Sequence, residues 1–172
     1  MQAELRAALA EDLDQLIRLH DRELDGDTLA ALKTAHFPDG LALAPADALG
    51  VQAYANVAAA LAGLPAAPAQ GVIDELAADY AAIYLNNRLG ASPYESVWLD
   101  DDHLACQRPM FELREIYAAA GFKAADWRSR FDDHLVLQLH YLRHLLQAPA
   151  VDGKKMANFI DEHVGYWFPD FA

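Results

Sequence analysis

The sequence predicts an all-α protein: a single-domain helical bundle of six to seven helices. Its 172 residues suit one domain, expected to span residues 1–172, with enough chain to bury a core. Alanine and leucine, which favour helix, are abundant. Apolar residues recur at three- and four-residue steps in several segments, as on one face of an amphipathic helix, and no segment alternates as a strand does.

Residues 4–21 are predicted to form the first helix. Its apolar residues at helical spacing are Leu5, Leu9, Leu13, Leu16 and Ile17. Acidic residues, Glu11, Asp12 and Asp14, fall on the other side of the predicted helix, which we expect to face water.

Turn signals separate two further helices in the first half of the chain. A short helix is predicted to start at Asp27 or Thr28, either of which can cap its first turn, and to end near Ala35. Another follows over 45–61, because Pro and Asp favour the start of a helix. The Ala- and Pro-rich segment 63–69 then forms a linker or a hinge.

The second half of the chain predicts four more helices. They cover 71–86, 109–121, 132–147 and 154–167. The first and third carry apolar residues at helical spacing, and proline and glycine residues delimit the other two. Gly121 is placed to end the second of them, because glycine readily takes the left-handed conformation found after helices.

The stretch "PYESVW", residues 93–98, lies in a predicted loop yet is rich in apolar and aromatic residues. Tyr94, Val97 and Trp98 follow Pro93, which restricts the backbone at the loop entry. Such a loop either packs against the core or presents an apolar surface to a partner. We expect Trp98 to pack inward and Pro93-Tyr94 to meet the partner.

Charge and composition exclude several classes of protein. With 13 basic and 26 acidic residues, the formal net charge is −13, which disfavours a nucleic-acid partner and favours a cationic one. The single cysteine, Cys106, allows no internal disulfide. The acidic N-terminus does not resemble a signal peptide, and no apolar run is long enough to span a membrane. We therefore expect a cytoplasmic protein without stable membrane insertion.

Few residues suggest catalysis or metal binding. No glycine-rich phosphate loop occurs. His140 and His144 share a helix face, but the glutamate of a zinc protease motif is replaced by Tyr141. Cys106 and His103 supply only two ligands, whereas structural zinc takes four. We expect no catalytic residue, no metal and no cofactor; a metal-dependent hydrolase using His134, His140 and His144 remains an alternative.

The segment "FDDHL", residues 131–135, precedes a strongly periodic helix. Asp132 or Asp133 is expected to cap this helix, which places His134 in its first turn. Positive charge is disfavoured at a helix N-terminus, so we expect a neutral His134 that is hydrogen-bonded to a neighbour. An Asp-His pair that faces a groove is the functional alternative.

Three stretches together resemble the TorD/DmsD family of redox-enzyme maturation chaperones. They are "PYESVWLDDDHLACQRPMFELREIYAAAGF" (93–122), "DDHLVLQLHYLRHL" (132–145) and "FIDEHVGYWFPDF" (159–171), and they occur in the order of the family's motifs. Two positions depart from the family pattern: Asp132 replaces a proline and Gln138 replaces a glutamate.

The resemblance implies a TorD-like fold and a non-catalytic, cytoplasmic chaperone with no cofactor of its own. Its partners would be the twin-arginine signal peptide and the apo catalytic subunit of a molybdopterin-containing oxidoreductase. The chaperone would assist cofactor insertion and delay export until then. The chain stops at Ala172, soon after its last motif, where many relatives continue, so we expect a monomer or a helix-swapped homodimer. A generic helical assembly protein remains an alternative.

The resemblance also implies a signal-peptide site, carried over residue by residue. Its residues are Tyr80, Ile83, Tyr84, Pro93, Tyr94, Trp98, Asp133 and His134. Aromatic residues suit the apolar part of such a peptide, and Asp133 together with the acidic run 100–102 would supply the charge that pairs with the arginines.

Overall fold

The computed structural model describes residues 2–124 and 130–171. Across those residues the regular elements are α-helices and two short π-helical segments, with no strand, which confirms the all-α prediction. The elements are α1 (Ala3–Asp21), α2 (Gly26–Thr34), α3 (Ala48–Gly63), α4 (Gln70–Tyr80), η1 (Ala81–Leu85), α5 (Glu95–Leu99), α6 (Arg108–Ala119), α7 (Leu135–Gln147), α8 (Gly153–Phe159), η2 (Ile160–Val164) and α9 (Gly165–Phe171).

Several of these helices are continuous with one another. The π-helical segment η1 extends α4, and η2 joins α8 to α9, so the nine α-helices of the described residues make eight continuous segments. The segment beyond the predicted six to seven is α5, which forms within the stretch expected to be a loop. The final helix also runs past residue 167 to Phe171, with Pro169 inside its last turn.

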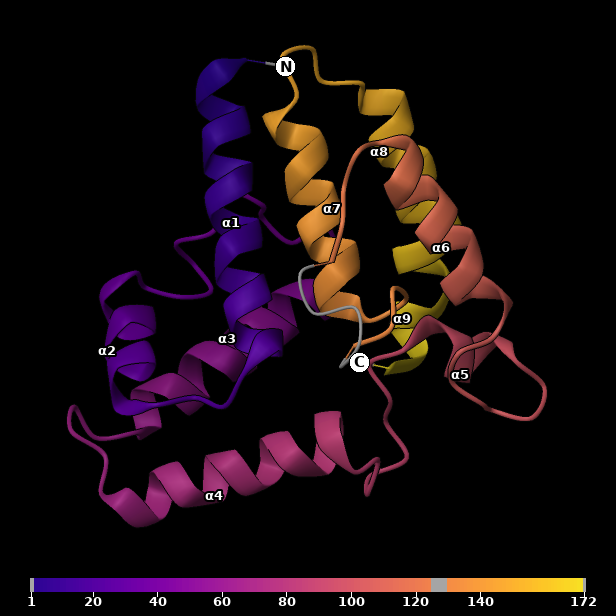
Figure 1. The fold of residues 1–172 in the computed structure, drawn as a ribbon. Coiled ribbons are helices and arrows are strands. Elements are labelled where there is room, and N and C mark those ends of the chain that lie inside the picture. The colour runs from indigo at the N-terminus through magenta and orange to yellow at the C-terminus, as the bar shows by residue number, and fades with distance from the viewer. Residues whose placement is uncertain (1, 125–129, 172) are drawn as a thin grey trace.

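Helix α7 lies at the centre of the molecule, and its side chains build two apolar clusters. One joins α6, α7 and α8; its buried members are Leu113, Tyr117, Leu137, Tyr141, Leu142, Leu145 and Phe159. The other joins α1, α7 and α9; its buried members are Ile17, Leu135, Val136, Leu139 and Trp167. Figure 1 shows α1 and α7 side by side, with α6 and the α8–α9 segment on the far side of α7.

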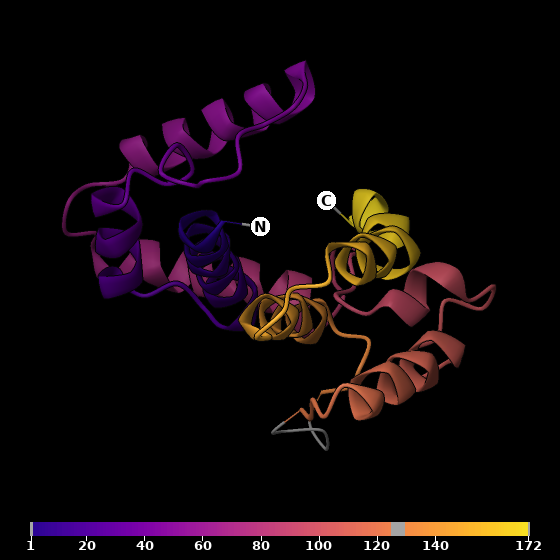
Figure 2. The ribbon, with the colours of Figure 1, turned by 90° about the horizontal axis from the view of Figure 1, so that it is seen from above.

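Helices α2, α3 and α4 lie at the margin of this bundle. No residue of α3 or α4 is buried, and Leu49 on α3 is 83% exposed. Seen from above, α3 stands apart from α1 and α7 (Figure 2). The ammonium group of Lys33 on α2 donates to the carbonyl groups of Leu64 and Pro65, which ties the linker after α3 to α2.

Local expectations for the first half of the chain are corrected in two places. Asp25, rather than Asp27 or Thr28, caps α2 by accepting from the Thr28 N–H group. Asp12 does not face water: it is 3% exposed, and its carboxylate accepts from the backbone N–H groups of Ala42 and Leu43, at 3.1 and 3.0 Å. It therefore anchors the connection between α2 and α3 to α1.

Gly121 ends α6 as predicted, with a positive φ of 68°. Among the described residues, no helix is long and apolar enough to cross a membrane.

Candidate functional site

The stretch 93–96 is docked on the N-terminus of α7 by backbone hydrogen bonds. Tyr94 and His134 form an antiparallel bridge. The Leu135 N–H group donates to the Pro93 carbonyl at 2.8 Å, and the Glu95 N–H group donates to the Asp133 carbonyl at 3.1 Å. These bonds satisfy the unpaired backbone groups at the starts of two helices at once. They hold α5 against α7.

Asp133 caps α5 from a distant part of the chain. Its carboxylate accepts from the Ser96 N–H group at 2.9 Å, whereas the N-cap residue of α5, Tyr94, makes no such bond. Asp133 is 0% exposed, and burial raises the pKa of its carboxyl group. The structure therefore places this carboxylate inside the protein, where it supports α5.

His134 is itself the N-cap of α7, rather than a residue of its first turn or a neighbour of a capping aspartate. Its Nδ1 accepts from the Val136 N–H group at 3.1 Å. Burial, aided by nearby Arg130, lowers the pKa of His134 to about 3. The expected neutral, hydrogen-bonded histidine is therefore confirmed, but its role is to cap the helix.

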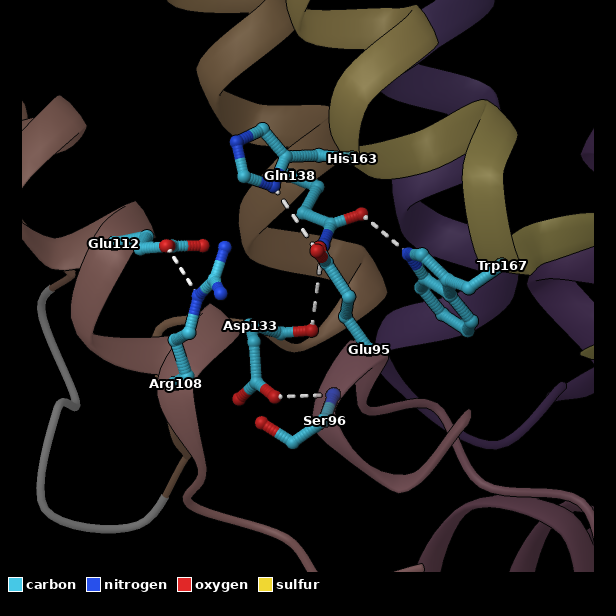
Figure 3. A network of polar contacts seen from close by, with 8 residues as sticks. All are labelled: Glu95, Ser96, Arg108, Glu112, Asp133, Gln138, His163 and Trp167. Atoms are coloured by element: carbon cyan, nitrogen blue, oxygen red, sulfur yellow. Dashed lines mark hydrogen bonds and ion pairs between the residues drawn. The ribbon is translucent and has the colours of Figure 1, made fainter. Parts of the chain in front are cut away.

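A buried polar network lies between α5, α7 and the C-terminal segment (Figure 3). The amide of Gln138 donates to Glu95, and its oxygen accepts from the Trp167 indole at 3.2 Å. Nδ1 of His163 contacts the other Glu95 oxygen at 3.0 Å. Burial raises the pKa of Glu95, and the bond to His163 acts against that shift. The network fixes the orientation of α5.

Several predicted aromatic residues gather beside the C-terminal end of α1. Tyr80 and Tyr84 stack at 4.6 Å between ring centroids, and the Tyr84 hydroxyl is 2.5 Å from Nδ1 of His20. Burial raises the pKa of Tyr84 to about 12 and lowers that of His20 to about 4, so both groups are uncharged at neutral pH. Both tyrosines remain partly exposed.

Tyr94 continues this aromatic set toward α7. Its ring packs edge-on against His134 at 4.9 Å and lies 5.7 Å from the ring of Phe131, which is 38% exposed. Burial raises the pKa of Tyr80, and Tyr94 makes the smallest of the further contributions to that shift. We call Tyr80, Tyr84, Tyr94 and Phe131 the aromatic surface.

The remaining predicted site residues, Pro93, Trp98 and Ile83, lie outside the aromatic surface. Pro93 is buried, and its carbonyl accepts a hydrogen bond from the Leu135 N–H group at the N-terminus of α7. Trp98 packs on the Ile17 cluster, and its indole donates to the Ser92 carbonyl at 2.8 Å, as expected for a packing residue. Ile83 is half-buried on η1. The structure thus divides the predicted set into five partly exposed side chains and three buried residues, Pro93, Asp133 and His134.

The sequence alone did not predict that Glu95, Gln138 and His163 are joined in one hydrogen-bond network. Each stands in a motif quoted above, but their contact joins positions 43 and 68 residues apart. The signal available was the replacement of the family's glutamate by Gln138, because an amide both donates and accepts where a carboxylate only accepts.

Two of the three histidines of the hydrolase alternative make structural hydrogen bonds. Nδ1 of His134 caps α7, and Nε2 of His144 lies 3.3 Å from the Ala120 carbonyl oxygen. Within residues 2–124 and 130–171, no group of three or more histidine, cysteine or acidic residues is arranged to hold a metal ion.

Comparison with known proteins gives one family and several relatives. The profile of the family described as nitrate reductase delta subunit matches residues 45–172. The chain is 33% identical over 108 residues to "Chaperone protein TorD" of Vibrio cholerae serotype O1 (strain ATCC 39541 / Classical Ogawa 395 / O395), covering 57% of this chain and 49% of the relative.

The protein of the same description from Vibrio parahaemolyticus serotype O3:K6 (strain RIMD 2210633) is 26% identical over 108 residues, covering 57% of this chain and 50% of the relative. The match thus spans about half the length of these curated relatives. No solved structure gives a significant match.

Proposed function

The chain belongs to the family described as nitrate reductase delta subunit, which includes TorD-like chaperones, and from this premise we propose that it is a maturation chaperone for a redox enzyme. In this role it binds the twin-arginine signal peptide of a molybdopterin-containing oxidoreductase in the cytoplasm. It retains the apo catalytic subunit until the cofactor is inserted.

The aromatic surface is the observation that carries this proposal. Signal peptides combine positive charge with an apolar segment, and partly exposed tyrosines bind apolar chains through their rings while their hydroxyl groups keep a hydrogen-bond partner. Tyr80, Tyr84 and Tyr94 are all partly exposed, and Phe131 adds an exposed ring. The formal charge of −13 attracts the arginines.

Four members of the predicted set act indirectly in this proposal. Pro93, Asp133 and His134 hold the loop that carries Tyr94, and Trp98 holds α5 on the core. Substituting Asp133 therefore perturbs the fold as well as binding, so it is a poor test of contact.

Calorimetric titration of the purified protein with a twin-arginine leader peptide tests the proposal. We expect Tyr94→Ala and Tyr84→Ala each to weaken binding by about tenfold, in line with the loss of an aromatic contact. Tyr54→Ala is the matched control, because Tyr54 lies on α3, outside the aromatic surface. Unchanged affinity in both aromatic variants, with circular dichroism as in the unsubstituted protein, would refute the assignment.

A further inference from the structure

A cavity of about 750 Å³ opens between the α5–α6 region and the η2–α9 segment, separate from the aromatic surface. Acidic side chains dominate its lining: Glu95, Asp100, Asp101, Glu112, Asp161 and Glu162. Its basic lining residues are Arg108 and His163. A cavity with this lining concentrates negative potential and attracts a cation.

Arg108 shows how the rim holds a guanidinium group. Its Nε donates to Glu112 at 2.7 Å, four residues along α6, while the Arg108 side chain is 86% exposed (Figure 3). An exposed pair of this kind contributes little to stability, so a ligand can displace it at small cost. Glu112 therefore already binds a guanidinium group, which is the group that an arginine ligand would bring.

His163 is the second observation that points to a ligand. The residue is 6% exposed and lines the cavity, and its Nδ1 is engaged by Glu95. Nε2 points away from Glu95 (Figure 3), and no described residue forms a hydrogen bond with it. With Nδ1 engaged by Glu95, Nε2 is the second polar atom of the ring, and a ligand in the cavity can bind it.

The apolar part of the lining suits the stem of a long side chain. Leu99 is 38% exposed and Tyr166 is 67% exposed, and Pro109 lies beside them. A methylene chain packs on such groups while its charged head reaches the carboxylates, and an aromatic face also attracts a planar cation.

We propose that this cavity binds an arginine side chain of the client's basic segment. Guanidinium carries five N–H donors and no acceptor, which matches a lining rich in carboxylates that accept hydrogen bonds. The proposal rests on the chaperone function above and deepens it. The cavity takes the arginines, and the aromatic surface, which shares no residue with the cavity lining, takes the apolar segment.

The first test titrates the full chain with acetyl-Arg-Arg-amide and, as a control, acetyl-Gln-Gln-amide. The ring resonances of His163, assigned by comparison with His163→Gln, are followed by nitrogen–proton correlation spectroscopy. We expect a saturable shift with the arginine dipeptide and none with the glutamine dipeptide. Absence of a shift at millimolar arginine dipeptide would overturn the proposal.

Two charge-matched double variants locate the binding. Asp161→Asn with Glu162→Gln removes two carboxylates from the cavity, and Asp74→Asn with Glu75→Gln removes an Asp-Glu pair from the exposed face of α4. We expect the first to weaken dipeptide binding about fivefold and the second to change it less than twofold. Equal weakening by both would show general electrostatic attraction and overturn the site.

A variant expected to strengthen binding, and a comparison with the full leader peptide, complete the test. Arg108→Gln removes the resident cation, so it should strengthen dipeptide binding about twofold or more; weaker binding contradicts competition at Glu112. If the dipeptide binds and the twin-arginine leader does not, the cavity is supported and the proposed function fails. If the leader binds and the dipeptide leaves His163 unshifted, the cavity fails while the function stands.

Discussion

At the scale of single residues, Gln138 is the centre of the buried network. It is 0% exposed, and its amide group contacts both Glu95 and Trp167 with opposite hydrogen-bonding roles. A carboxylate here would lose the donor and lie against the Glu95 carboxylate, leaving two like charges in a buried site. The amide is therefore the group that this pairing with Glu95 requires.

We predict that Gln138→Glu lowers the free energy of unfolding by about 2–4 kcal/mol at pH 7. The loss should shrink at pH 5, because a proton shared between the two carboxyl groups restores a donor. Urea denaturation at both pH values measures it. Gln52→Glu, on the exposed side of α3, makes the same charge change and should stay within about 0.5 kcal/mol. A Gln138→Glu variant as stable as this control would contradict the network.

His134 makes stability depend on pH in a defined direction. Its pKa is about 3 in the folded protein, against 6.5 as its ordinary value. Below pH 6.5 the unfolded chain takes up a proton that the folded protein does not, so stability is lost as pH falls from about 6.5 to 3. Glu95 and Asp133, whose pKa values are raised, act in the opposite direction.

Comparing His134→Asn with the unsubstituted protein isolates this contribution, because the carboxyl effects are common to both. Asparagine retains an N-cap acceptor for the Val136 N–H group but does not titrate. Between pH 7 and pH 5 we expect the unsubstituted protein to lose about 2 kcal/mol more than the variant. Equal losses in chemical denaturation at the two pH values would show that His134 titrates normally when folded.

At the scale of elements, the sequence predicts long amphipathic helices well and contacts between distant segments poorly. The stripe of leucines predicts α7, and Gly121 predicts the end of α6, because both signals are local. Helix α5 was expected to be a loop. It has five residues, and its cap comes from Asp133, 37 positions beyond Ser96 along the chain.

The same limit applies to the candidate site. Tyr94 and His134 are in contact, as the resemblance led us to expect, but the burial of Asp133 depends on α5 closing over it. The π-helical segments were also outside the prediction. They carry Tyr84 in one case and His163 in the other, consistent with the frequent occurrence of π-helical turns at functional sites.

At the scale of the whole molecule, stability is unevenly distributed. Helix α7 buries nine residues, whereas α3 buries none and exposes Leu49, Val51 and Val57. An alanine-rich helix of 16 residues is marginal without tertiary packing. The free energy of local opening should therefore be small in α3 and close to the global value in α7.

Hydrogen exchange followed by mass spectrometry tests this at low protein concentration, where the monomer dominates. We expect amides of 50–62 to exchange at least about a hundredfold faster than those of 137–146, with little dependence on denaturant, because α3 opens without global unfolding. Helix α6 provides an internal reference, since its Leu113 and Tyr117 are buried in the α7 cluster and should follow α7. Protection of α3 equal to that of α7 would contradict the prediction. If that protection disappeared on dilution, a second copy of the chain would be covering the exposed leucine and valines, as in the predicted helix-swapped dimer.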